Sequence, residues 1–67
     1  MKIKLKIRER REALNMTQAD LVKATGLRQP RVCRYDSGKE FPTIEKLVIL
    51  SKALKCEWHE LVDVTEA

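Results

Sequence analysis

The stretch TQADLVKATGLRQPRVCRYD, residues 17–36, decides the fold of this chain. Thr17 is a favourable helix N-cap because its hydroxyl can accept a hydrogen bond from an early backbone N–H group. Gly26 supplies the left-handed backbone conformation in which a helix ends at little cost. We therefore predict a helix from Gln18 to Ala24 or Thr25, a tight turn, and a second helix over residues 29–36.

The second of these helices has a polar outer side. Val32 and Tyr35 are spaced i and i+3 and form its inward pair. The side chains that then project outward are those of Gln29, Arg31, Arg34, and Cys33 or Arg28. Two short helices joined by a tight turn form a helix-turn-helix, whose second helix fits the major groove of DNA. Arginine pairs bidentately with guanine and glutamine with adenine, so this side of the helix favours contact with DNA.

The segment before this pair of helices has two interpretations. Residues 2–7 alternate between lysine and an apolar residue, as in a strand. Ile3, Ile7, Arg11 and Leu14 also fall on one helical stripe, and the following RERREAL contains strong helix formers. We favour a helix over about residues 4–14.

Two more helices are expected after the pair. Thr43 is the N-cap of a helix that ends near Leu54. The expected buried stripe of this helix is Ile44, Leu47, Leu50, Ser51 and Leu54. A short last helix, over about residues 58–62, has Trp58, Leu61 and Val62 as its apolar face. The five short helices predict an all-α bundle that occupies residues 1–67 as a single domain.

Length and charge limit the possible functions. A chain of 67 residues buries only about 60% of the surface that its unfolded form exposes, so it does not easily enclose a substrate pocket as well. We therefore expect no enzyme and no catalytic residue. Residues 1–39 carry eleven basic and four acidic residues, a balance of +7, whereas the remaining residues balance at −3. This asymmetry suits a polyanion at one end of the domain.

The cysteines and His59 give little sign of a metal site or cofactor. Cys33 and Cys56 are too few for the disulfide framework of a small secreted domain, which favours reduced thiols and a cytoplasmic protein. Cys56 and His59 supply two ligands, whereas a structural zinc site needs four, so we expect no metal and no cofactor. Cys33 on the outer side of its helix is the better candidate for redox sensitivity. We also expect no membrane segment.

The stretch MTQADLVKATGLRQPRVCRYDSGKEFPTIEKLVILSKAL, residues 16–54, resembles the phage repressor and Cro type of helix-turn-helix protein, the XRE family. The resemblance covers roughly residues 3–62. Its pieces are Thr17-Gln18, Leu21, Gly26-Leu27, Val32, Asp36-Ser37-Gly38-Lys39, Pro42-Thr43 and the run from Leu50 to Leu54. It implies a compact five-helix, lambda-repressor-like bundle that contains a helix-turn-helix.

The resemblance also implies roles for individual residues. The family positions that read bases correspond to Gln29, Pro30 and Arg34, and Arg31 between them faces either a base or the DNA backbone. The positions expected to contact phosphate are Gln18, Thr17, Arg28 and Lys39, and Gln18 also braces the first reading residue. Arg11 and Asp36 match a structural ion pair. The chain departs from the family pattern at Arg28, where a Ser or Thr cap is usual, at Pro30, where a polar reader is common, and at Val22 and Thr25.

These observations predict a sequence-specific transcriptional regulator, most simply a repressor, that binds double-stranded DNA as a homodimer on a palindromic operator. We expect dimer contacts from exposed apolar residues of the C-terminal part: Val48, Ile49, Trp58, Leu61 and Val64. No small-molecule ligand is expected. The alternative is a protein-binding module of the same fold, for instance an antitoxin, with DNA binding secondary; a stable heteromeric partner would distinguish it.

Overall fold

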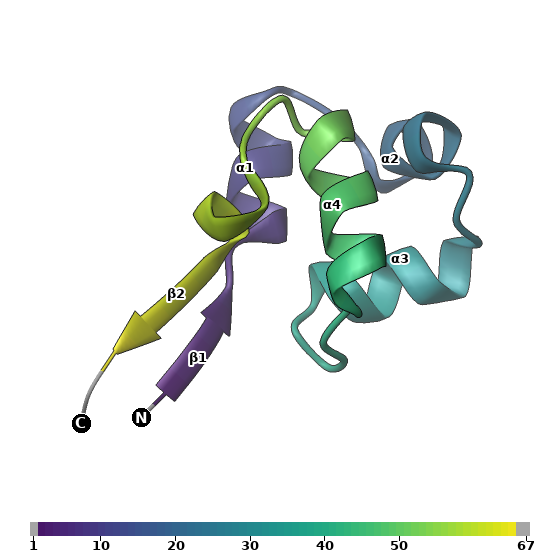
Figure 1. The fold of residues 1–67 in the computed structure, drawn as a ribbon. Helices are drawn as coiled ribbons and strands as arrows, with labels where there is room; N and C mark the ends of the chain where they lie inside the picture. The colour runs from purple at the N-terminus through teal and green to yellow at the C-terminus, as the bar shows by residue number, and fades with distance from the viewer. Residues whose placement is uncertain (1, 66–67) are drawn as a thin grey trace.

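The computed structural model describes residues 2–65, which form four α-helices, one turn of 3-10 helix and two strands. The elements are β1 (Lys2–Leu5), α1 (Ile7–Ala13), α2 (Gln18–Thr25), α3 (Gln29–Asp36), α4 (Ile44–Ala53), η1 (Trp58–Leu61) and β2 (Val62–Thr65). Figure 1 shows the helices gathered into one body, from which the two strands project together as a ribbon. No helix within residues 2–65 is long and apolar enough to cross a membrane.

The helix-turn-helix forms where the sequence predicts it, as α2, the turn after it, and α3. The Thr17 hydroxyl accepts from the backbone N–H of Asp20 at 3.0 Å, and the Asp20 carboxylate accepts from the backbone N–H of Thr17 at 2.9 Å. Gly26 ends α2 with φ +74°, a left-handed conformation that favours glycine. The Thr25 hydroxyl stabilises the turn, since it donates to the Leu21 carbonyl and accepts from the backbone N–H of Leu27.

Thr17 should contribute more to stability than the other threonine cap. Thr43 also caps a helix, α4, by accepting from the backbone N–H of Lys46, but it lacks the reciprocal bond that Asp20 supplies to Thr17. We expect Thr17→Ala to lower the free energy of unfolding by about 1 kcal/mol and Thr43→Ala by less. Urea denaturation of both variants checks this order, and an equal or larger decrease for Thr43→Ala would contradict it.

The two ends of the chain correct the prediction of five helices. Residues 2–5 form a strand, and the first helix begins only at Ile7. The expected last helix is a single 3-10 turn, after which Val62–Thr65 pairs antiparallel with β1, with Leu5 opposite Val62 and Ile3 opposite Val64. The period-two alternation of residues 2–7 indicated the correct structure, a strand. The strand that pairs with it lies some sixty residues away in the sequence, so the pairing could not be predicted from neighbouring residues.

The core lies where the helices meet the base of the ribbon. It consists of Leu5, Ile7, Leu21, Val32, Tyr35, Leu47, Leu50, Leu54 and Leu61. Ile44 is 63% exposed at the first position of α4, so its expected place in the buried stripe is wrong. Leu61 is wholly buried, so it is a core residue and not one of the exposed apolar residues expected to contact a second copy. Inward Val32 and Tyr35 are confirmed, which turns the opposite side of α3 to the surface.

Candidate nucleic-acid interface

A buried carboxylate organises the site. Asp36, the last residue of α3, has a fully buried side chain. Its Oδ1 lies 2.7 Å from Arg11 Nε, which makes the ion pair that the family resemblance implies. Its Oδ2 accepts from Arg8 Nε at 2.9 Å and from Gln18 Nε2 at 3.0 Å. One carboxylate thus joins α1, the start of α2 and the end of α3.

The electrostatics of this cluster favour the charged forms of both partners. Burial raises the pKa of the Asp36 carboxyl, but the hydrogen bonds from Arg11, Arg8 and Gln18 outweigh burial and bring the pKa below its usual value. The hydrogen bond to Asp36 raises the pKa of Arg11. The Arg11 guanidinium also donates from Nη1 to the Met16 carbonyl at 2.7 Å. The ion pair is therefore charged at neutral pH. Through its bond to Met16, Arg11 also holds the segment that leads into α2.

A hydrogen bond from Gln29 to Gln18 connects the buried cluster to the exposed surface of α3. Gln29 Nε2 donates to Gln18 Oε1 at 3.1 Å, so the first residue of α3 is held by the first residue of α2. Gln18 is in turn held by buried Asp36. The exposed amide of Gln29 therefore has a defined position before any ligand arrives, which lowers the conformational entropy that it loses on binding.

The outer side of α3 presents the residues expected to read bases. Gln29, Pro30, Arg31 and Arg34 are all exposed. Arg28 is the N-cap residue of α3 and makes no side-chain capping bond, because a guanidinium donates hydrogen bonds and cannot accept one from a backbone N–H group. Pro30 lies in the first turn, where the helix has no use for its missing N–H group. The departures from the family pattern thus leave α3 intact and its surface cationic.

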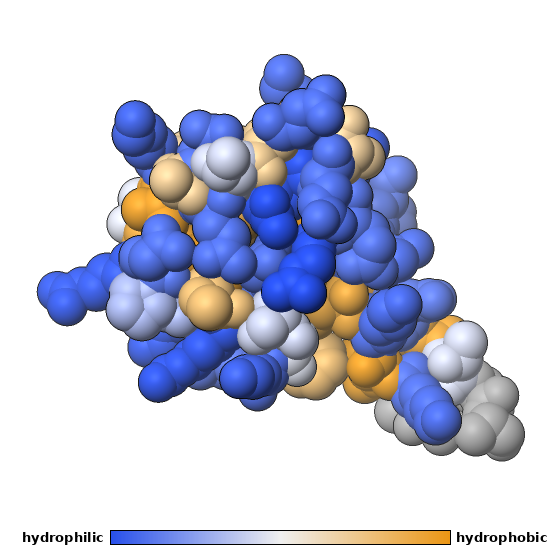
Figure 2. Space-filling view, turned by 180° about the vertical axis from the view of Figure 1, so that it is seen from behind, coloured by the Kyte–Doolittle hydropathy of each residue, from blue (hydrophilic) through white to orange (hydrophobic). Residues whose placement is uncertain are grey.

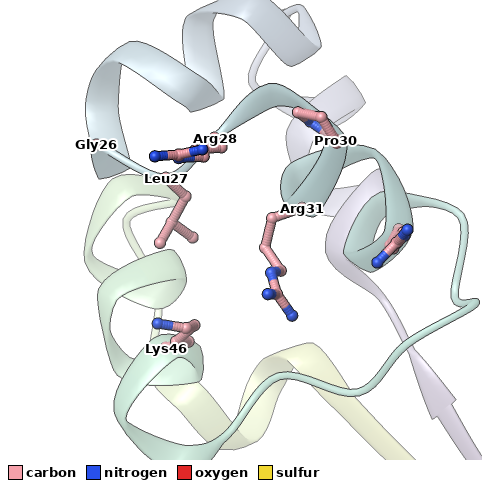
Figure 3. Close-up of a pocket in the computed structure, with 7 residues that line it drawn as sticks. Gly26, Leu27, Arg28, Pro30, Arg31 and Lys46 are labelled. Atoms are coloured by element: carbon pink, nitrogen blue, oxygen red, sulfur yellow. The ribbon is translucent and has the colours of Figure 1, made fainter.

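Lys46 is a cationic neighbour that the sequence analysis did not select. A hollow of about 400 Å³ lies between the turn, α3 and α4, and its lining includes Arg28, Arg31, Arg34 and Lys46. Figure 3 shows the Arg31 side chain reaching into this space from α3, with Lys46 across from it on α4. The sequence predicts that Lys46 lies in the first turn of a helix, but it does not predict that this helix, α4, lies beside α3. Four cations around one hollow favour a phosphate or another anion.

Glu40 is an acidic residue on this cationic surface, also missed by the sequence analysis. Its Oε2 lies 2.5 Å from Arg31 Nη1 and its Oε1 lies 3.7 Å from Arg34 Nη1. The hydrogen bond to Glu40 is the main cause of a raised pKa at Arg31. Its contacts depend on the loop after α3: Gly38 marks the turn in the sequence, but nothing local predicts which side chains the loop brings together.

The remaining expected residues are scattered. Thr17 and Lys39 are exposed near the two ends of the helix-turn-helix. Val48 and Ile49 are half-buried on α4, whereas Trp58 and Val64 are exposed at η1 and on the ribbon. Both cysteines are free thiols, and burial raises the pKa of Cys56. The expected base-reading residues thus all lie on the exposed side of α3, whereas the expected dimer residues come from three elements, α4, η1 and β2.

The chain is similar in sequence and fold to known repressor proteins. The chain is 38% identical over 61 residues to the cryptic phage CTXphi transcriptional repressor RstR of Vibrio cholerae, which is 91% of this chain and 54% of that protein. The chain therefore spans about half the length of this curated relative. The P22 c2 repressor protein, solved in complex with a synthetic operator, matches with a TM-score of 0.75 and 36% identity over 84% of this chain and 85% of that chain.

A transcriptional regulator from Listeria innocua shares the fold, with a TM-score of 0.69 and 23% identity over 96% of this chain and 64% of that chain. The helix-turn-helix family matches residues 7–61, which include all four helices and η1. The chain belongs to the helix-turn-helix family of the XRE type, to which phage repressors also belong.

Proposed function

We propose that this protein is a sequence-specific transcriptional repressor that binds double-stranded DNA as a homodimer in the cytoplasm. The observation that carries the proposal is the outer face of α3. Arg31 and Arg34 are exposed there, and the side chain of Gln29 is held by a hydrogen bond to Gln18. An exposed helix with a fixed glutamine and two arginines has the width and the donors needed to read base edges in the major groove.

In this proposal α3 reads bases while the residues around it hold the DNA backbone. Arg34 and Arg31 donate to guanine, Gln29 pairs with adenine, and Pro30 makes apolar contact with a thymine methyl group. The proposed phosphate contacts are Gln18, Thr17, Arg28, Lys39 and, from the structure, Lys46. Repression follows from occupation of a promoter, without a cofactor, a small-molecule ligand or a catalytic step.

Two copies are needed because one such domain makes few contacts with DNA. A two-fold dimer places the two α3 helices in successive major grooves, about 34 Å apart, and requires a palindromic operator. The relatives support this proposal: the P22 c2 repressor protein was solved with an operator, and RstR is named a transcriptional repressor.

We propose that the partner copy covers the apolar face of the ribbon. Ile3 and Val64 lie opposite each other in register and are 46% and 54% exposed, and Trp58 nearby in sequence is 43% exposed. In Figure 2 one of the larger orange areas lies at the base of the ribbon, at the lower right, on a face that is otherwise largely blue. A two-stranded ribbon is marginally stable unless it packs on something, so its uncovered apolar face favours a second copy.

Val64→Asp should therefore convert the dimer to monomer. A carboxylate buried in an apolar contact costs several kcal/mol, so we expect the dimer dissociation constant to rise at least about a hundredfold. Sedimentation equilibrium measures it. Thr65→Asp is the matched control because it adds the same charge to the adjacent, opposite-facing position of β2. An unchanged dimer in Val64→Asp would place the interface elsewhere.

The function itself is tested by selecting bound sequences from a random duplex pool with the purified protein and measuring their affinity across salt concentrations. A palindromic consensus with a steep dependence on salt supports the proposal. If no sequence is enriched and no duplex binds even at low salt, the DNA proposal is wrong, and a protein partner becomes the better explanation of the fold.

A further inference from the structure

We propose that Glu40 is a specificity-determining residue, which holds Arg31 and Arg34 in the free protein and so weakens binding to DNA that offers no matching bases. This inference rests on the proposed function. It starts from the one carboxylate found against the arginines of α3 within residues 2–65, at 2.5 Å from Arg31 Nη1 and 3.7 Å from Arg34 Nη1.

The backbone fixes Glu40 in this position. After α3 ends, the backbone N–H groups of Lys39 and Glu40 both donate to the Arg34 carbonyl, at 3.0 and 3.4 Å. Gly38, with φ +77°, provides the left-handed residue that turns the chain back. The loop thus curls over the last turn of α3 and sets the Glu40 carboxylate beside the two guanidinium groups. Its side chain is only 32% exposed, less than those of Arg31 and Arg34, at 47% and 61%.

The charges explain why this contact discriminates between DNA sequences. Both arginines must leave Glu40, or share it, before they can reach phosphate, and the carboxylate itself repels the phosphate backbone. At random DNA a phosphate contact replaces the ion pair with little net gain. At the operator each arginine can instead form two aligned hydrogen bonds to a guanine, which offset the separation from Glu40. Glu40 therefore lowers affinity for random DNA more than affinity for the operator.

Glu40→Gln tests this directly, because it keeps the size of the side chain and removes the charge. We expect affinity for a random duplex to rise about tenfold at low salt, affinity for the selected operator to change by less than about threefold, and the ratio between them to fall. The log–log salt slope for the random duplex should steepen by about one for each arginine freed. Thermal unfolding should remain close to that of the unaltered protein, because Glu40 lies at the surface.

Asp63→Asn is the matched control, since it removes one negative charge from the exposed outer face of the ribbon, away from α3 (Figure 1). If it raises affinity for random DNA as much as Glu40→Gln does, the effect is one of net charge, and the inference is wrong. The inference is also wrong if Glu40→Gln leaves the affinity ratio unchanged, or if it lowers operator affinity and alters the preference at a cytosine, because Glu40 would then read a base. Absence of DNA binding by the unaltered protein would overturn the proposed function itself, which separates the two failures.

Discussion

Asp36→Ala is expected to lower the free energy of unfolding by about 3–5 kcal/mol, a large share of the stability of so small a domain. The substitution removes the acceptor for three side chains at once. Arg11, whose side chain is only 12% exposed, is left as a charge without its partner, and Gln18 loses the hydrogen bond that holds it against α3. Urea denaturation followed by circular dichroism measures the decrease.

The burial of the Asp36 carboxylate is the reason for so large an effect, and an exposed acid provides the control. Asp63→Ala removes a carboxylate from the outer face of the ribbon, so we expect it to change stability by less than about 0.5 kcal/mol. Asp36→Asn should fall between the two, because the amide retains an acceptor oxygen but not the charge. Equal decreases for Asp36→Ala and Asp63→Ala would show that the buried cluster does not stabilise the fold.

The same carboxylate should make stability depend on pH. Its folded pKa lies below the unfolded value of about 3.9, so its contribution is complete above that value and disappears as the pH falls through the folded pKa. The difference in unfolding free energy between the unaltered protein and Asp36→Asn should therefore be constant above about pH 5 and shrink below about pH 4. A difference that stays constant down to acid pH would mean that the carboxyl is not paired in the folded state.

Local signals explain why three helices could be predicted from the sequence and the chain ends could not. The Thr17 and Thr43 caps mark the starts of α2 and α4, Gly26 marks the end of α2, and Pro30 lies in the first turn of α3. The strand β1 forms because β2 pairs with it from the far end of the chain. A helix and a strand were both compatible with residues 2–7, and only the tertiary partner decides between them.

One part of the candidate site could be predicted from the sequence, and another part could not. The outward side of α3 follows from helical spacing once Val32 and Tyr35 are known to point inward. The contacts of Arg8, Glu40 and Lys46 depend on how α1, the loop after α3, and α4 pack around that helix. These residues are far apart in the sequence, and no helical or strand spacing relates them. The sequence therefore predicts the exposed side of α3 that is proposed to read bases, but not the residues packed around it.

Arg34→Ala is expected to be the most damaging substitution for operator recognition. Loss of the proposed bidentate pairing of Arg34 with guanine costs about 1–3 kcal/mol, and the proposed dimer would lose it in both half-sites, which gives about 2–6 kcal/mol. The Arg34 side chain is 61% exposed and has no role in the core, so the fold should survive. Selection from a random pool should then yield a consensus that is relaxed at one symmetric pair of positions.

Lys39→Ala provides the contrast, because Lys39 is an exposed cation of the adjacent loop with no proposed base contact. We expect it to weaken binding to every duplex alike and to flatten the salt slope by about one for each phosphate that is no longer neutralised, without a change of consensus. Affinity measurements on the operator, on an operator with the symmetric position altered, and on random DNA separate the two patterns. If Arg34→Ala keeps the consensus and weakens all three duplexes equally, Arg34 holds phosphate and the reading of bases falls to Gln29 and Arg31.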